Sequence, residues 1–304
     1  MKITGTKICS LLGAAAASVC LISASGQQAT AGQLYNGWNY GIDAFNDGAG
    51  GASYDIKGMA IKETADSIFV ALTGGMPLIG VANSGAADGN IGWGDLFFNF
   101  SGKDFKTASN QGSLFGIRFA GTNDSNVATT GVYKNVSAAS VTGVNSGFSS
   151  LKQYYNNSSF NKTNTQGTDL PTAQAAYNYF YPTAVASNPT TGNTPILNVI
   201  NSGTKVGDIT MLTSSALAAA GLDFGYFSAN GTQTIGFQFS RSLLGSGGYI
   251  ANVFMECGND GVALAGNLRQ VPEPSGIVGL ALVGLTAGGS MLRKRRSVSL
   301  NTIE

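Results

Sequence analysis

The chain alternates short segments rich in β-branched and aromatic residues with turns rich in Gly, Asn, Ser and Asp. Branched and aromatic side chains suit a pleated sheet, and the turn residues accept the backbone angles that end a strand. The pattern therefore predicts strands rather than helices. We expect strands at residues 53–61, 67–73, 95–100, 113–120, 131–136, 233–240 and 248–257, with the first two paired as a hairpin.

These strands predict an all-β fold, an antiparallel β-sandwich of jelly-roll-like form with long surface loops. A parallel sheet would need crossover helices, and the sequence indicates only one convincing helix. That helix starts after Thr213, whose hydroxyl suits an N-cap, and ends at Gly221. Residues 146–201 are dense in Asn, Thr, Ser, Gly and Tyr, which predicts a loop-rich insertion with a short helix at 173–177.

The absence of histidine from all 304 residues limits the chemistry of the chain. It excludes a Ser-His-Asp triad, a Cys-His pair and imidazole metal ligands, and it leaves carboxylate, Tyr, Lys and Cys chemistry open. Charged residues make up 11% of the chain, against about 25% in average proteins, and the net charge is +1. Such a chain lacks the basic surface of a nucleic-acid binder, so we expect no nucleic-acid partner.

The first 31 residues have the order of a secretory signal peptide. Two lysines precede an uncharged apolar run at 8–22, and Ala29 and Ala31 give the small-x-small pattern that signal peptidase accepts. We expect signal peptidase to cut after Ala31, so that Gly32 begins the exported chain, and residues 23–25 offer a second cleavage site.

The C-terminal region combines a proline break, an apolar stretch and a basic cluster. Residues 275–292 are uncharged, and 18 residues reach the lower limit for crossing a bilayer core, so we expect a transmembrane helix there. The basic cluster keeps its side in the cytoplasm, which makes 297–304 a cytoplasmic tail. Hydropathy alone leaves open whether this span stays as a permanent single-pass anchor or is removed. The break and the cluster consist of Val271, Pro272, Glu273, Pro274, Arg293, Lys294, Arg295 and Arg296.

This tripartite order resembles the PEP-CTERM sorting signal of exosortase substrates in Gram-negative bacteria. The resemblance covers residues 271–296, and the chain departs from the pattern because its tail continues through 297–304. It implies that a membrane-embedded, exosortase-type processing enzyme cuts near residues 272–274. The inner membrane would then be a transient partner, and the body would be released or passed on to the cell surface.

Three segments of the body resemble a cyanobacterial family of exosortase-dependent surface proteins. They are Gly-Trp-Asn-Tyr-Gly-Ile-Asp at 37–43, the Gly- and Phe-containing stretch at 88–100, and Glu-Cys-Gly-Asn-Asp at 256–260. Members of that family have no assigned activity. The resemblance therefore implies a destination for the ectodomain at 32–270 and no reaction.

Acidic residues on two Gly-containing loops are candidate calcium ligands. Asp43, Asp47 and Asp88 place carboxylate oxygens, which Ca²⁺ prefers, beside turn residues. Neither loop has the ligand spacing of a calcium loop with its closing Glu, and Asp-Gly pairs are also standard in turns with positive φ. A Ca²⁺ site and simple turns both remain open, and turns are favoured.

Aromatic residues beside glycines are candidate contacts for an extracellular polysaccharide. In exposed loops, Trp38, Tyr40 and Trp93 would stack on sugar rings, with nearby Asn and Asp side chains as acceptors. The alternative is that these rings fill the ends of the sandwich core, and this core interpretation is favoured.

Carboxylates that could act in pairs are scattered along the chain. A glycosidase needs two of them about 5 to 9 Å apart. Glu256 and Asp260 form the tightest acidic group beside a strand end, and a strand-ending turn explains the same residues. The further candidates are Glu63, Asp95 and Asp223.

One cysteine, Cys257, remains after removal of the signal peptide. A single thiol excludes an internal disulfide. Cys257 is either a buried small apolar residue or a free thiol able to form an intermolecular bridge, and its position at the end of an apolar run favours burial.

These features predict an exported, non-enzymatic protein of the cell surface or extracellular matrix with a structural or adhesive role. The alternative is a secreted carbohydrate-binding or carbohydrate-acting module on the same fold. The body between the two ends has 11 basic and 15 acidic residues, and this mild acidity gives no reason to expect a polyanionic partner.

Overall fold

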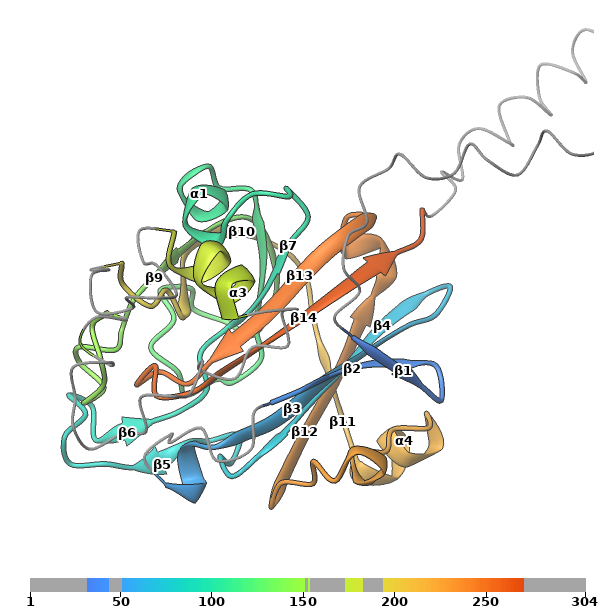
Figure 1. The fold of residues 1–304 in the computed structure, drawn as a ribbon, viewed down its shortest axis with the longest axis horizontal. Coiled ribbons are helices and arrows are strands. Elements are labelled where there is room, and N and C mark those ends of the chain that lie inside the picture. Colours follow the sequence, from blue (N-terminus) through green and yellow to red (C-terminus); the bar gives the residue numbers. More distant parts are fainter. Residues whose placement is uncertain (1–31, 44–50, 151–152, 154–172, 183–193, 271–304) are drawn as a thin grey trace, which may run out of the picture.

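The computed structural model describes residues 32–43, 51–150, 153, 173–182 and 194–270. These residues form a mostly β protein in which two six-stranded antiparallel sheets pack together as a sandwich, with few short helices (Figure 1). The predicted antiparallel sandwich is confirmed. The signal peptide expected at 1–31 and the sorting signal, membrane span and tail expected at 271–304 lie outside the described residues.

The first sheet contains the N-terminal strands and two later ones. Its order is β1-β2-β3-β4-β12-β11. The strands are β1 (Gln33–Tyr35), β2 (Trp38–Ile42), β3 (Ile56–Glu63), β4 (Ser67–Gly74), β11 (Thr210–Leu212) and β12 (Gln233–Ser240).

The second sheet contains the middle strands and the last hairpin. Its order is β10-β9-β8-β7-β13-β14. The strands are β7 (Leu96–Asn99), β8 (Leu114–Arg118), β9 (Gly131–Ala139), β10 (Val199–Gly207), β13 (Gly247–Phe254) and β14 (Gly261–Leu268). A small separate ladder pairs β5 (Val81–Ala82) with β6 (Asn90–Ile91).

The connectivity is that of two meanders, each extended by a hairpin. Strands β1 to β4 follow one another in the first sheet and β7 to β10 in the second, and then β11–β12 joins β4 and β13–β14 joins β7. This corrects the jelly-roll-like form that we expected, in which strands adjacent in sequence cross between sheets more often. Short turns favour such meanders because neighbouring strands pair locally.

Each of the seven predicted strands overlaps a strand of the structure. The expected first hairpin is β3–β4, closed by a bond from the Thr64 amide to the Ser67 carbonyl. The expected helix is α4 (Ser214–Ala219), in which the Thr213 hydroxyl accepts the Ala216 amide at 3.2 Å. Gly221 follows with φ +86°, a conformation that only glycine adopts without strain.

Of the loop-rich insertion expected at 146–201, residues 151–152, 154–172 and 183–193 lie outside the described residues, and the described part is not all loop. It contains α3 (Ala173–Phe180), which is longer than the helix expected at 173–177, and β10 begins inside its last residues at Val199. The other short helices are α1 (Phe105–Asn110), η1 (Ala52–Tyr54), η3 (Gly225–Phe227) and η4 (Arg241–Leu243).

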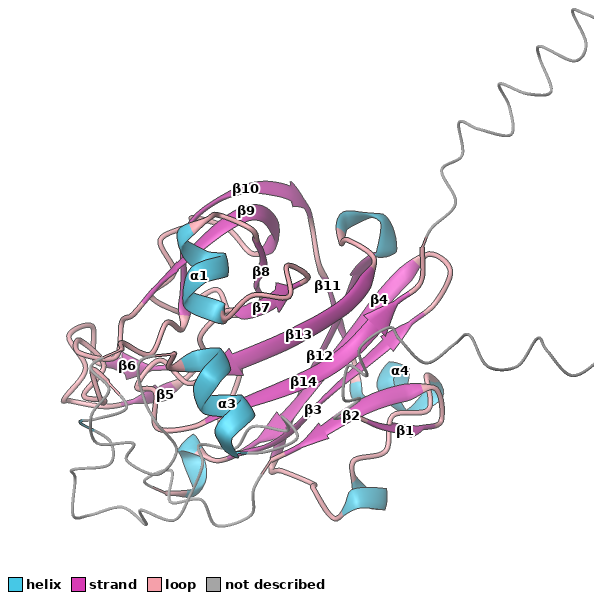
Figure 2. Ribbon diagram, turned by 45° about the horizontal axis from the view of Figure 1, so that its top comes forward, coloured by secondary structure: helices cyan, strands magenta, loops and turns pink. Residues whose placement is uncertain are grey.

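Apolar side chains are buried in three layers rather than one. The main core lies between the sheets and includes Leu72, Phe98 and Phe237. Helices α1 and α3 cover the outer face of the second sheet, and α4 and η3 cover that of the first (Figure 2). Because both faces of the sheets are partly covered, many strands are apolar on both sides.

Candidate functional site

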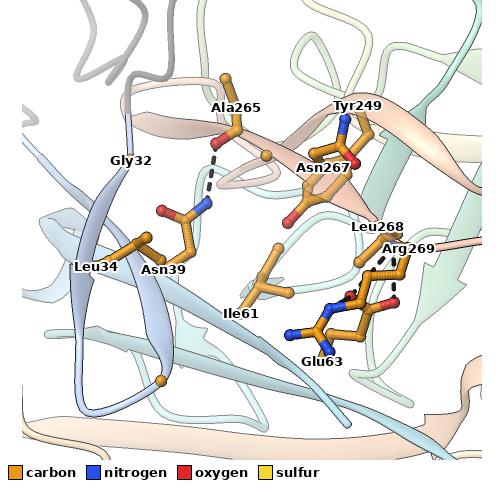
Figure 3. Close-up of a pocket in the computed structure, with 12 residues that line it drawn as sticks. Gly32, Leu34, Asn39, Ile61, Glu63, Tyr249, Ala265, Asn267, Leu268 and Arg269 are labelled. Atoms are coloured by element: carbon orange, nitrogen blue, oxygen red, sulfur yellow. Dashed lines mark hydrogen bonds and ion pairs between the residues drawn. The ribbon is translucent and has the colours of Figure 1, made fainter. Parts of the chain in front are cut away.

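A groove of about 440 Å³ lies where the edge strand β14 approaches β2 and β3 (Figure 3). Both ends of the sandwich chain line it, since Gly32 precedes β1 and Arg269 follows β14. We call it the terminal groove. Leu34, Asn39 and Ile61 come from the first sheet, and Tyr249 and the last residues of β14 come from the second.

Two local features shape the groove at β14. The Asn39 amide donates to the Ala265 carbonyl at 2.9 Å, which links β2 to β14 between the sheets. Gly266 leaves room for the ring of Tyr249, because a Cβ atom at position 266 would lie 2.4 Å from the Tyr249 hydroxyl oxygen. Burial raises the pKa of Tyr249.

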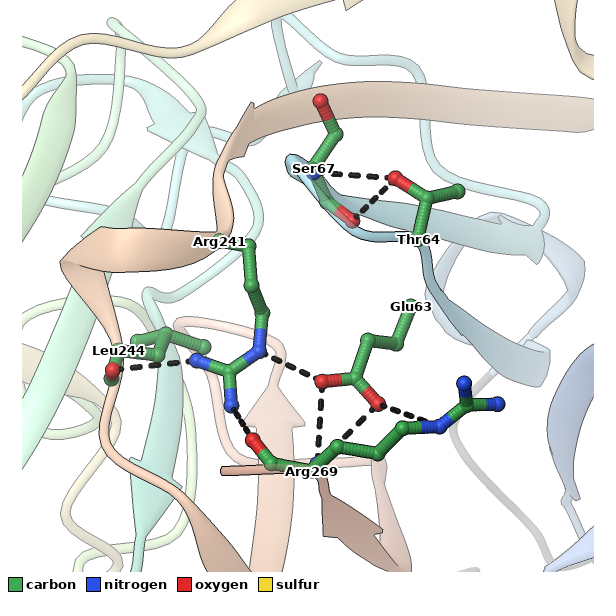
Figure 4. A network of polar contacts seen from close by, with 6 residues as sticks. All are labelled: Glu63, Thr64, Ser67, Arg241, Leu244 and Arg269. Carbon is green, nitrogen blue, oxygen red and sulfur yellow. Dashed lines mark hydrogen bonds and ion pairs between the residues drawn. The ribbon is translucent and has the colours of Figure 1, made fainter. Parts of the chain in front are cut away.

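A buried arginine, Arg241, bonds to two of the groove residues, Glu63 and Arg269 (Figure 4). The side chain of Arg241 is 2% exposed, and its Nε lies 2.6 Å from Oε1 of Glu63 at the end of β3. Its two terminal nitrogens donate to the carbonyls of Leu244 and Arg269. The Glu63 carboxylate also accepts the Arg269 amide at 3.1 Å.

We call Glu63, Arg241 and the backbone of Arg269 the terminal clamp. Both the amide and the carbonyl of Arg269 are engaged, so the clamp fixes the chain one residue beyond β14. The Arg269 side chain is 92% exposed, and its Nε lies 3.9 Å from Glu63. An exposed pair at that distance adds little stability, so the backbone bonds define the clamp.

The opposite end of the β13–β14 hairpin is held by buried carboxylates. Glu256 is 1% exposed and accepts the amides of Gly92 at 2.7 Å and of Asp124 at 2.5 Å. Burial, with smaller contributions from the Asp124 and Asp88 carboxylates, raises the pKa of Glu256 to about 7.

Asp95 and Asp260 also bond to the backbone. Asp260 accepts the Ile56 amide at 2.6 Å, which ties the loop between β13 and β14 to the first sheet. Asp95 accepts the Ile200 amide at 2.7 Å and the Asn123 side-chain amide at 2.8 Å, and burial raises its pKa. These carboxylates join loops that are distant in sequence. The local turn expected at Asp260 is present, because its other oxygen accepts the Gly261 amide.

The aromatic residues considered for sugar stacking are in the core. Trp38, Tyr40 and Trp93 are each 0% exposed. The Trp38 and Trp93 ring nitrogens donate to the carbonyls of Ala220 and Met76. Exposed loop positions for these rings are therefore ruled out: Trp38 and Tyr40 belong to β2, and Trp93 bridges to Met255 on the backbone.

The calcium candidates are not assembled into a site among the described residues. Asp43 is buried, and Asp88 is exposed and accepts the Asn90 amide at 2.9 Å in a local turn. Asp47 lies outside the described residues. In the part of the chain that the structure describes, no group of three or more His, Cys, Asp or Glu side chains is placed to hold a metal ion.

Comparisons of the chain with protein-family models, with curated proteins and with solved structures find no match. Within the described ranges, no helix has the length and apolar character needed to cross a membrane. The span expected at 275–292 lies outside those ranges.

Cys257 is 1% exposed, and burial raises the pKa of its thiol to about 12. We therefore expect no reaction of the native protein with a maleimide at pH 7 and rapid reaction in urea, because only the thiolate attacks. Mass spectrometry of the labelled chain measures this. The variant Leu34→Cys, whose position is 82% exposed, should take up one label without urea. Equal labelling of wild type with and without urea would contradict burial.

Proposed function

We propose that this chain is an exported, non-enzymatic protein that an exosortase-type system processes at its C-terminus and delivers to the cell surface or extracellular matrix. Its role there is structural or adhesive. The observation that carries the proposal is the order of the proline break, the apolar stretch at 275–292 and the cluster at 293–296. In this proposal the apolar stretch forms a transmembrane helix until processing.

The end of the sandwich supports this division of the chain. Strand β14 ends at Leu268, and the terminal clamp fixes Arg269. One residue, Gln270, separates the last clamped residue from Val271, where the segment to be cut begins. A processing enzyme could then act on that segment without opening either sheet.

The arrangement of carboxylates supports a role without catalysis. Glu256, Asp95 and Asp260 bond to backbone amides in the interior, where they join loops. In the terminal groove the acidic residue Glu63 is already bonded to Arg241. The paired, accessible carboxylates that a glycosidase requires are thus not found in this groove.

The alternative of a carbohydrate-binding module has lost its main support. It relied on Trp38, Tyr40 and Trp93 as exposed rings, and each of these rings packs inside the protein. We therefore do not propose polysaccharide binding at these residues.

Processing can be tested in one bacterial host with and without an exosortase-type enzyme. With the enzyme, we expect mass spectra of the mature protein to end near residues 272–274, and without it to extend to Glu304. Changing Pro272 and Pro274 together to alanine should preserve the long form even with the enzyme. The variant Ser297→Ala, beyond the signal, is the matched control and should be processed normally. An uncut chain in both hosts, or a cytosolic chain with its first 31 residues, would contradict the proposal.

A further inference from the structure

The two chain ends of the sandwich lie at one end of the molecule. Gly32 and Arg269 line the same groove, and the turn between β3 and β4 lies at this end because Glu63 closes β3 beside Arg269. The eight residues of β4 then lead away from it to the region of β5 and β6 (Figure 1). At about 3.3 Å per residue, this strand separates the two ends by roughly 25 Å.

The connection from the sandwich to the proposed span is short. Five residue steps separate Gln270 from Ser275, the first residue of the apolar stretch. A fully extended chain covers at most about 3.6 Å per residue, so these steps reach about 18 Å. The headgroup layer on one side of a bilayer takes up about 5–7 Å of that distance. The groove end of the sandwich is therefore confined close to the headgroups while the span is inserted.

The surface at this end carries an apolar residue that the fold leaves uncovered. Leu34 on the edge strand β1 is 82% exposed, the largest exposure among the large apolar residues found exposed in the described chain. The Arg269 side chain is 92% exposed on the other wall of the groove. Leucine partitions into the interfacial layer of a bilayer, and arginine extends its guanidinium toward phosphates.

We propose that the terminal-groove end of the sandwich docks on the outer face of the inner membrane before processing, with Leu34 and Arg269 in contact with the lipid headgroup layer. This inference rests on the proposed function, because it needs the 275–292 segment in the membrane. It adds an orientation: the 255–260 loop and the β5–β6 ladder point away from the lipid. Cleavage near 272–274 removes the tether and releases this face.

The experiment compares two exposed positions at opposite ends. The exported chain through Glu304 is placed in vesicles of phosphatidylethanolamine and phosphatidylglycerol. Two variants are compared, Leu34→Cys and the control Ile79→Cys, and each carries an environment-sensitive fluorophore on the new cysteine. Ile79 is 69% exposed and lies between β4 and β5 at the far end. The native Cys257 is buried and does not compete for the label. Lipids with brominated chains then report contact by quenching.

We expect brominated lipids to quench most of the emission at position 34 and to leave that at position 79 unchanged. A carbonate wash separates the two proposals. If the chain is washed off the vesicles, the membrane span and with it the proposed function fail. If the chain stays and position 34 is not quenched more than position 79, docking alone is overturned. A third outcome is that lipid does not quench position 34, and that its emission instead shifts with protein concentration in the absence of lipid. A second copy of the chain would then cover Leu34, and this result also overturns docking.

Discussion

Replacing Arg241 with methionine should lower the free energy of unfolding by about 3 kcal/mol, the lower end of the range for breaking a buried ion pair. Methionine keeps an apolar stem of similar length but leaves the Glu63 carboxylate without its buried cation. The carbonyls of Leu244 and Arg269 lose a donor as well. We expect the lower end because the Glu63 side chain is 16% exposed, so water reaches it. Urea denaturation monitored by tryptophan fluorescence measures the change.

Two further variants test whether the clamp explains this loss. Arg269→Gln removes an exposed guanidinium and keeps both backbone bonds, so its effect should stay within about 0.5 kcal/mol. The double variant Arg241→Met with Glu63→Met should recover part of the loss, because no unpaired charge remains. If the double variant is less stable than the sum of the two single changes predicts, the pair does not act as we describe.

The free energy of unfolding should fall as the pH rises from about 4.5 to 7, because of the buried carboxyl group of Glu256. Above pH 7 this group should add little further change. The pKa of Glu256 is raised in the folded protein from 4.5 to about 7, so the folded state holds the proton more tightly than the unfolded state. The stability from this group is therefore fully present below pH 4.5 and is lost as the pH passes 7. At about 1.4 kcal/mol per pH unit, the loss is of the order of 3 kcal/mol.

The variant Glu256→Gln isolates this contribution. Glutamine resembles the protonated acid, so the difference in unfolding free energy between wild type and variant should shrink or reverse from pH 5 to pH 8. Asp95, whose pKa is also raised, contributes equally to both proteins. A second variant, Asp88→Asn, keeps an acceptor for the Asn90 amide and removes a negative charge that raises the pKa of Glu256. It should therefore lower that pKa and reduce the slope of unfolding free energy against pH. Parallel pH profiles for wild type and Glu256→Gln would refute the assignment.

Local patterns predicted the elements that form locally. The β3–β4 hairpin and α4 depend on residues within one short stretch, such as Thr213 and Gly221, and both are present. Alternation along a strand is a weaker guide to which residues are buried. Phe97 and Phe98 are neighbours on β7 and point to opposite faces, yet both are 0% exposed. Alternation of apolar and polar residues identifies a strand with one face in solvent. Here α1 and α3 cover the outer face of the second sheet, so apolar residues occur on both faces.

The terminal groove and clamp could not be predicted, because their contacts join distant residues. Glu63 bonds to Arg241 across 178 positions and to Arg269 across 206. One signal was available: Arg241 is the only charged residue between Asp223 and Glu256. A lone cation in so apolar a stretch indicates a buried partner, although the sequence does not say which acid provides it. In the same way, the sequence around Trp38 and Tyr40 does not indicate that α4 and η3, far along the chain, cover these two rings.

The clamp also determines where a mechanical load would enter the folded protein. Arg241 belongs to the segment that joins β12 of one sheet to β13 of the other, and Glu63 ends β3. Tension applied along the tail reaches the Arg269 backbone first and is divided between both layers through these side chains. Peeling of the edge strand β14 from the second sheet thus requires rupture of the hydrogen bonds that tie the Arg269 backbone to the buried Arg241–Glu63 pair, before the first strand-to-strand bond is stretched.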